Sequence, residues 1–110
     1  MDSTPLTPHL RHDISLFVGA RLADDVDFAH QSGQMLVELG ASKLGVAPDK
    51  AEREARRSVY AAERKRELFE ATVRPYLGTA GPTGLIADQQ LRLLASMYSG
   101  HRDYRDEWRP

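Results

Sequence analysis

Seven polar side chains in the first third of the chain are of the types that bind metal ions or move protons. They are, in chain order, His9, His12, Asp13, Asp24, Asp25, Asp27 and His30. A protein metal site needs three or four ligands that converge from different elements, and one helix cannot complete such a site. The sequence also contains no His-Glu-x-x-His or Glu-x-x-His pair. We therefore expect solvated polar residues here, with no metal and no cofactor.

Nucleophilic and phosphate-binding chemistry lack their usual motifs. There is no cysteine, which excludes thiolate zinc sites, disulfide scaffolds and cysteine nucleophiles. No serine lies in a Gly-x-Ser-x-Gly elbow, and the glycine-rich run at residues 78–84 lacks the Lys-Ser/Thr ending of a phosphate loop. We expect a protein that is not an enzyme, and an enzyme or metal protein around His9, His12, Asp24, Asp27 and His30 is the least favoured alternative.

A basic face with an embedded aromatic residue runs along residues 50–66. At 100° per residue, one side of a helix would carry Lys50, Arg53, Arg57, Tyr60 and Arg64. Such a face can contact a phosphate backbone. However, residues 47–77 hold eight basic and six acidic residues, a net of only +2. Nucleic-acid binding is therefore the alternative, and a solvated helix face is the favoured interpretation.

The last twenty residues carry aromatic side chains in a charged stretch. His101, Tyr104 and Trp108 recur at intervals of three and four, so a last helical turn could carry all three, and Tyr98 precedes them in the third helix. Tyrosine and tryptophan combine apolar area with a polar tip and are enriched at interfaces. Two interpretations stay open. The tail is either a clasp that covers the end of a small core, which we favour, or a recognition patch for a partner.

Hydrophobic spacing predicts three helices and no strands. The first runs over residues 8–44, where Thr7 caps and Pro8 opens the helix. Its stripe continues at steps of three or four past Gly33, where the helix could break. The second helix begins at Pro48 and runs to about residue 74, and Pro75 either kinks it or ends it one residue earlier. Residues 78–84 form a loop, and the third helix spans about residues 85–99.

Small residues recur every seven positions along the first helix, at Gly19, Val26, Gly33 and Gly40. They lie almost on one line, so they permit close helix–helix contact, which could be a dimer seam. The first helix, about 36 residues and ~54 Å long, is also longer than the second, which is about 27 residues. The uncovered length predicts a homodimer, with a bent first helix in a monomer as the alternative.

Composition places the chain among small globular proteins. Its 110 residues suffice for one domain, with 41% hydrophobic and 28% charged residues and a formal net charge of −1. This balance excludes a strongly basic nucleic-acid coat and an acidic tail protein. No segment resembles a secretory signal or a membrane span, so we expect a cytoplasmic protein without a membrane partner. Twelve of the fifteen basic residues are arginine, which fits a GC-rich genome.

Three stretches carry a resemblance to a family. Residues 91–95 (LRLLA), followed by Tyr98, His101 and residues 103–110 (DYRDEWRP), resemble the closing motif of short actinobacterial proteins of unknown function. Residues 16–25 (LFVGARLADD) are similar to that family's first helix, and residues 62–66 (AERKR) to its middle one. Many members have a cysteine before the Leu-Arg-Leu-Leu stretch, where this chain has residues 88–90 (DQQ), so a role built on that cysteine does not apply. The resemblance implies a helical fold and a host or phage source, and it implies no activity.

Together these patterns predict an all-α fold, a small antiparallel helical bundle of two long helices plus a short third. We expect a single helical domain over residues 1–110, with a flexible segment at residues 1–7 and an aromatic, charged tail at residues 101–110. The expected function is a self-associating protein-interaction module whose partner is a second copy or another protein. Its interaction residues would be Gly19, Val26, Gly33, Gly40, Tyr98, His101, Tyr104 and Trp108.

Overall fold

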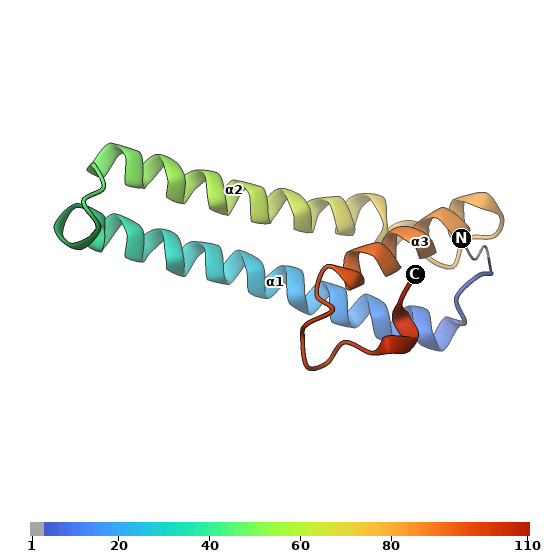
Figure 1. The fold of residues 1–110 in the computed structure, drawn as a ribbon. Coiled ribbons are helices and arrows are strands. Elements are labelled where there is room, and N and C mark those ends of the chain that lie inside the picture. The colour runs from blue at the N-terminus through green and yellow to red at the C-terminus, as the bar shows by residue number, and fades with distance from the viewer. Residues whose placement is uncertain (1–3) are drawn as a thin grey trace. The chain divides into compact units, whose positions relative to one another are not determined.

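The computed structural model describes residues 4–110, apart from the side chain of Ala41. Within these residues it is 77% helical and contains no strand (Figure 1), which confirms the all-α class. The three helices longer than one or two turns are α1 (Pro8–Leu39), α2 (Pro48–Thr72) and α3 (Pro82–Ser96). Three short helical segments accompany them, the π-helical η1 (Gly40–Leu44) and the 3₁₀ turns η2 (Arg74–Tyr76) and η3 (Asp106–Trp108). None of the described helices is both long and apolar enough to cross a bilayer.

The start and end of α1 follow the local signals in the sequence. The Thr7 hydroxyl accepts a hydrogen bond from the Leu10 backbone N–H at 3.3 Å, which caps the helix as predicted. Helical structure continues through Gly33 without a break and passes into η1. It ends at Gly45, whose φ of 68° lies in the left-handed region that favours glycine.

The connection between α2 and α3 is shorter than the sequence indicates. α2 ends at Thr72, and Pro75 lies in η2. α3 begins at Pro82 rather than near residue 85, because Gly81 has a φ of 78° and proline suits the first helical turn. Gly84 is therefore helical and buried, where a Cβ atom would collide with the Thr79 carbonyl. The expectation of a loop over residues 78–84 was wrong for its last three residues.

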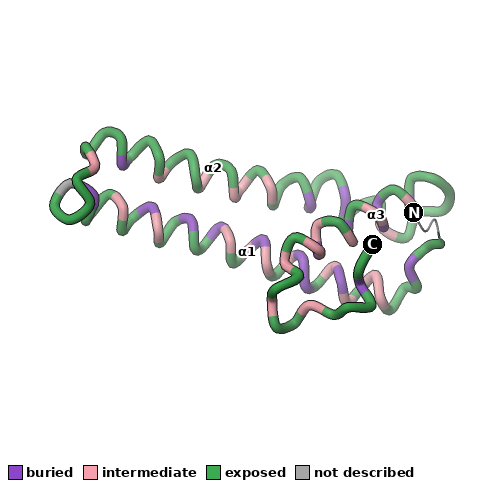
Figure 2. Tube along the Cα trace, in the orientation of Figure 1, coloured by how far each residue is buried: buried purple, intermediate pink, exposed green. Residues whose placement is uncertain are grey.

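The chain divides into two compact units. The first, called here the hairpin unit, is Leu22–Arg66, the end of α1 and the start of α2 joined by η1. The second, the three-helix unit, combines residues 4–21 with Glu67–Pro110. Its buried apolar residues are Leu6, Ile14, Phe17, Val18, Phe69, Val73, Ala87, Leu91, Ala95 and Trp108. Figure 2 shows buried stretches alternating with exposed ones along α1 and α3.

The segments outside the long helices differ from expectation in detail. Residues 1–3 of the predicted flexible segment lie outside the described residues, whereas the Leu6 side chain is buried at 7% exposure. In the tail, only Asp106–Trp108 forms a helical turn, so the tail is less helical than the aromatic spacing suggests. Trp108 is buried at 3% exposure.

Candidate interaction surface

Small side chains bring the two helices of the hairpin unit close together. A Cβ atom built on Gly33 would lie 3.0 Å from the Ala55 Cβ, and one on Gly40 would lie 3.6 Å from the Ala51 Cβ. The distance at Gly33 is tighter than most Cβ contacts, so a larger side chain there would push the helices apart, whereas the distance at Gly40 is ordinary van der Waals contact. The glycine line thus provides close helix contact within one chain at Gly33 and Gly40.

An apolar groove of about 620 Å³ runs along one side of the hairpin unit. From α1 it is lined by His30, Gly33, Gln34, Val37 and Glu38. From α2 it is lined by Ala55, Arg56, Val59, Tyr60 and Glu63. The small residues that let the helices approach leave the groove open, so Val37 stays 42% exposed and Tyr60 62% exposed. Two helices alone cannot cover this surface, because each has neighbours on one side only.

Several of the side chains that line the groove are polar or charged. The His30 Nε2 atom is 3.6 Å from the Glu63 Oε1 atom, an ion pair when the histidine is protonated. Glu38 accepts a hydrogen bond from the Gln34 side-chain amide at 3.1 Å. Arg56 is exposed and forms no ion pair with any described residue. The groove is thus lined by apolar side chains together with charged side chains of both signs.

The predicted basic face of α2 is exposed in all five of its residues, Lys50, Arg53, Arg57, Tyr60 and Arg64. Its charges are partly balanced. Arg53 Nη2 lies 3.8 Å from the Asp49 carboxylate, and Arg64 Nη2 lies 3.8 Å from the Glu63 carboxylate. The Arg64 guanidinium also stacks 4.9 Å from the centre of the Tyr60 ring. Nucleic-acid binding through this face stays a prediction.

An aromatic cluster in the three-helix unit gathers the predicted residues of the tail around Phe17. The Phe17 ring centre lies 6.4 Å from that of Tyr98, 5.6 Å from His101, 6.0 Å from Tyr104 and 5.1 Å from Trp108. All four of these pairs are edge-on or tilted, the arrangements that aromatic quadrupoles favour. Because Trp108 is buried within this cluster, its ring contributes to a core rather than to an open surface.

Polar atoms border the aromatic cluster. His101 contacts the Arg21 guanidinium through its ring nitrogens, and its Nδ1 atom accepts a hydrogen bond from the Asp103 backbone N–H at 3.0 Å. The Tyr104 hydroxyl and the Trp108 indole N–H are buried without a hydrogen-bond partner among the described residues. Gly19 is also in this unit, beneath the side chains of Phe69 and Arg74. Of the remaining glycine-line positions, Val26 belongs to the hairpin unit and is buried.

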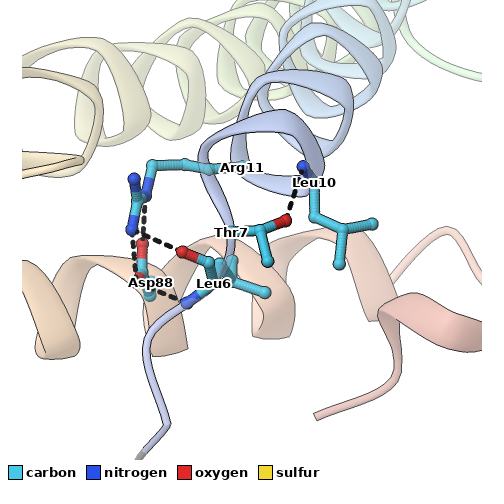
Figure 3. A network of polar contacts seen from close by, with 5 residues as sticks. All are labelled: Leu6, Thr7, Leu10, Arg11 and Asp88. Atoms are coloured by element: carbon cyan, nitrogen blue, oxygen red, sulfur yellow. Dashed lines mark hydrogen bonds and ion pairs between the residues drawn. The ribbon is translucent and has the colours of Figure 1, made fainter.

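A buried ion pair that the sequence did not reveal holds the start of α1 to α3 (Figure 3). Asp88 accepts hydrogen bonds from the Arg11 guanidinium, at 2.8 and 3.1 Å, and from the Leu6 backbone N–H at 3.1 Å. Arg11 also donates to the Leu6 carbonyl oxygen at 2.9 Å. The hydrogen bond to Asp88 raises the pKa of Arg11, and partial burial opposes that increase.

The position of Asp88 in the sequence does hold a signal. It shares one helix face with Gly84, Ala87, Leu91 and Ala95, all of them buried. A carboxylate on such a face must find a partner. The partner itself could not be identified from spacing, because Arg11 lies 77 residues away in the sequence.

The histidine and aspartate side chains of α1 that could bind a metal ion do not converge on one site. His9 Nε2 lies 3.4 Å from the Asp13 carboxylate one turn later, and Asp13 also faces Arg105 at 3.8 Å. In the hairpin unit, Asp24, Asp27 and His30 are exposed or at the surface. Among residues 4–110, no group of three or more His, Cys, Asp or Glu side chains is arranged to hold a metal ion.

Comparison with known proteins gives a family and no activity. The model of a family of unknown function, DUF6221, matches residues 11–110. No curated protein matches the chain. No solved structure matches it either.

Proposed function

Because this chain belongs to DUF6221, a family of unknown function, we propose its function from its own residues: a non-enzymatic, self-associating protein-interaction module. The observation that carries this proposal is the apolar groove of the hairpin unit, with the exposed side chains of Val37 and Tyr60 along it. Apolar surface left open on a small protein is stabilised when another molecule covers it. A second hairpin would convert two helices into a four-helix arrangement with a shared core.

The experiment is a measurement of mass in solution against protein concentration, by analytical ultracentrifugation. We expect a monomer–dimer equilibrium for the unaltered chain. Tyr60→Ala removes an aromatic side chain from the groove and should raise the dimer Kd by about tenfold, the effect of losing a moderate interface contact. A chain that stays monomeric at every concentration would contradict the proposal of self-association.

Phe28→Ala is the matched control. Phe28 is an aromatic residue of the same unit with 71% exposure, but it does not line the groove. The dimer Kd of this variant should stay within about twofold of the unaltered value. Equal weakening by both substitutions would show that the groove is not the contact surface.

A second candidate, nucleic-acid binding, is favoured by the exposure of Lys50, Arg53 and Arg57 on one side of α2. Phosphate contacts of this kind weaken steeply as salt rises. A mobility shift with duplex or single-stranded nucleic acid at low salt, lost as salt is added, would support it. The absence of a shift at low salt would remove it.

We further propose that the closing stretch of residues 91–110 is a signature of this family and that its members are actinobacterial or phage-borne. Support comes from the burial of Leu91, Ala95 and Trp108 within that stretch, since buried positions tolerate fewer residue types. The arginine-rich composition is consistent with a GC-rich source.

A further inference from the structure

We propose that the three-helix unit has a binding site for a small organic oxyanion, that is, a carboxylate or phosphate group attached to an apolar body. The site is a pocket of about 490 Å³ where the tail runs beside the first half of α1 (Figure 1). Pockets of this size are typical of small-molecule sites. The inference goes beyond the proposed function, because the pocket lies outside the hairpin unit and does not depend on self-association.

Three guanidinium groups line this pocket, those of Arg21, Arg102 and Arg105. The Arg102 side chain makes no ion pair or hydrogen bond with any residue in the described part of the chain. Arg105 lies 3.8 Å from the carboxylates of Asp13 and Glu107, too far for a hydrogen bond to either. Both guanidinium groups therefore keep N–H donors in the fork geometry that matches a carboxylate or phosphate.

The pocket has an excess of positive charge. Asp13 and Asp103 also line it, so three guanidinium groups are accompanied by two carboxylates. Each carboxylate is also close to a histidine, since Asp13 lies 3.4 Å from His9 and Asp103 lies 3.9 Å from His101. One further negative charge would balance the pocket, and a bound anion would reduce the repulsion between the guanidinium groups.

Aromatic rings hold two of the guanidinium groups in place. The Arg21 guanidinium carbon lies 5.5 Å from the centre of the Phe17 ring, and that of Arg105 lies 5.5 Å from the centre of the Trp108 ring. The centres of the two rings are 5.1 Å apart, and both residues line the pocket. Its wall thus combines positive charge with apolar surface. This combination favours an anion with an apolar body over a bare inorganic ion.

The indole N–H of Trp108 is an independent observation that points to a ligand. Trp108 is 3% exposed and lines the pocket, yet its Nε1 atom has no hydrogen-bond partner among the described residues. A buried N–H without an acceptor costs free energy, which an oxygen atom of a ligand would recover. The Arg105 side chain over this ring is 58% exposed, so it changes rotamer easily and can open access to the indole.

The experiment follows the indole N–H signal of Trp108 by NMR while benzoate or phenyl phosphate is added to the full-length chain. Trp108 is the single tryptophan of the chain, so its indole signal is unambiguous. We expect a saturable shift with a Kd of about 1 mM or lower for at least one of the two anions, as befits a ligand of this size. The tighter of the two identifies the preferred group as carboxylate or phosphate.

Benzamide separates the effect of charge from the effect of the ring. It has the ring of benzoate and a neutral amide in place of the carboxylate. It should bind about tenfold more weakly than the better of the two anions, because it forms no charge-assisted hydrogen bonds with the guanidinium groups. Binding of benzamide as tight as that of the better anion would overturn the oxyanion site.

Arg102→Gln tests the pocket itself. It removes one guanidinium group from the pocket and breaks no ion pair within residues 4–110. We expect the Kd of the better anion to rise by about fivefold, a modest change because Arg102 is exposed. The matched control is Arg109→Gln, which removes the same charge from an exposed position of the same tail that does not line the pocket. Its Kd should stay within about twofold of the unaltered value.

Two further outcomes would overturn the site. An indole signal that stays in place at about 10 mM of either anion, ten times the expected Kd, would show that the pocket binds no such ligand. Equal weakening by Arg102→Gln and Arg109→Gln would show that the net charge of the tail, rather than the pocket, attracts the anion. Thermal unfolding of both variants checks that the three-helix unit remains folded.

Discussion

At the scale of single residues, Asp88 and Arg11 determine how the first residues of the described chain are held. The carboxylate receives three hydrogen bonds, two from the guanidinium and one from the Leu6 backbone N–H. The Arg11 guanidinium has a raised pKa, so it is charged in the folded chain at every pH below its already high unfolded value. The stabilisation that this group adds is therefore fully present at neutral pH and is lost only in strong alkali.

Removal of the Asp88 carboxylate should strongly destabilise the three-helix unit. Asp88→Ala leaves the Arg11 guanidinium without its partner, with only 18% of its side chain exposed. We expect a loss of about 2–3 kcal/mol in the free energy of unfolding, below the largest values for broken buried pairs because water still reaches Arg11. Urea denaturation followed by circular dichroism measures it.

Asp106→Ala is the comparison for this prediction. It breaks an exposed ion pair in the same unit, in which the Arg109 Nη2 atom lies 3.2 Å from the Asp106 carboxylate. This pair should contribute less than about 0.5 kcal/mol. Similar losses from Asp88→Ala and Asp106→Ala would contradict the assigned role of the buried pair.

At the scale of elements, helix starts were predictable where a local signal marks them. Thr7 with Pro8, and Pro48 at the start of α2, gave boundaries that the structure confirms. The start of α3 was less predictable because glycines and prolines follow one another between residues 78 and 84 and each could mark a turn. The order of the three helices and most of their buried positions followed from spacing alone, but Leu44 and Tyr76, which spacing placed at the ends of the buried stripes, are exposed.

The groove and the aromatic cluster could not be predicted from residue spacing. Periodicity identifies which residues share a face, but it does not say how far two helices stand apart. In the hairpin unit that separation follows from Gly33 against Ala55, a contact between distant positions of the sequence. Arg56 lines the groove for this reason, although the sequence analysis did not single it out.

Gly33→Leu tests the close approach of α1 and α2. A leucine side chain at this position has no space beside Ala55, since even its Cβ atom would lie 3.0 Å from the Ala55 Cβ. The substitution gains about 1 kcal/mol of helix propensity over glycine, and overpacking costs about 1–3 kcal/mol. We expect a net destabilisation of about 1 kcal/mol, together with a changed groove and a weaker dimer, measured by thermal unfolding and sedimentation.

Gln31→Leu is the control for Gly33→Leu. Gln31 is an exposed position of α1 two residues earlier, where the added leucine meets solvent rather than α2. Its unfolding free energy should stay within about 0.5 kcal/mol of the unaltered chain. If Gly33→Leu were as well tolerated as Gln31→Leu, the helices would not depend on a small residue at this contact.

At the scale of the whole molecule, the two units account for different properties. The three-helix unit holds most of the large buried side chains, including Ile14, Phe69 and Leu91. The hairpin unit buries mainly small residues where its helices meet and leaves an apolar groove. We therefore expect substitutions in the three-helix unit to alter mainly the stability of the fold. Substitutions in the hairpin unit should alter mainly self-association.

Deletion of residues 101–110 tests this division and the role of the tail. The deletion removes Trp108, Tyr104 and His101 from the aromatic cluster and exposes Phe17. We expect a loss of about 3 kcal/mol, the usual cost of removing a buried tryptophan, and a fall in Tm of about 10 °C or more. The dimer Kd, measured below the new Tm, should stay nearly unchanged. An unchanged Tm with a lost dimer would instead identify the tail as the recognition patch.

The position of Phe17 has a consequence for how the chain folds during synthesis on the ribosome. Its ring neighbours are Tyr98, His101, Tyr104 and Trp108, all of which are translated long after it. Asp88, which binds the Leu6 N–H, likewise emerges 82 residues after Leu6. The hairpin unit is built from segments that are near in sequence, so it can fold early. The apolar side chains in the first turns of α1 stay exposed to solvent until translation has nearly reached Trp108. Nascent chains that are stalled before that point should therefore bind chaperones that recognise exposed apolar segments. Full-length chains should release these chaperones.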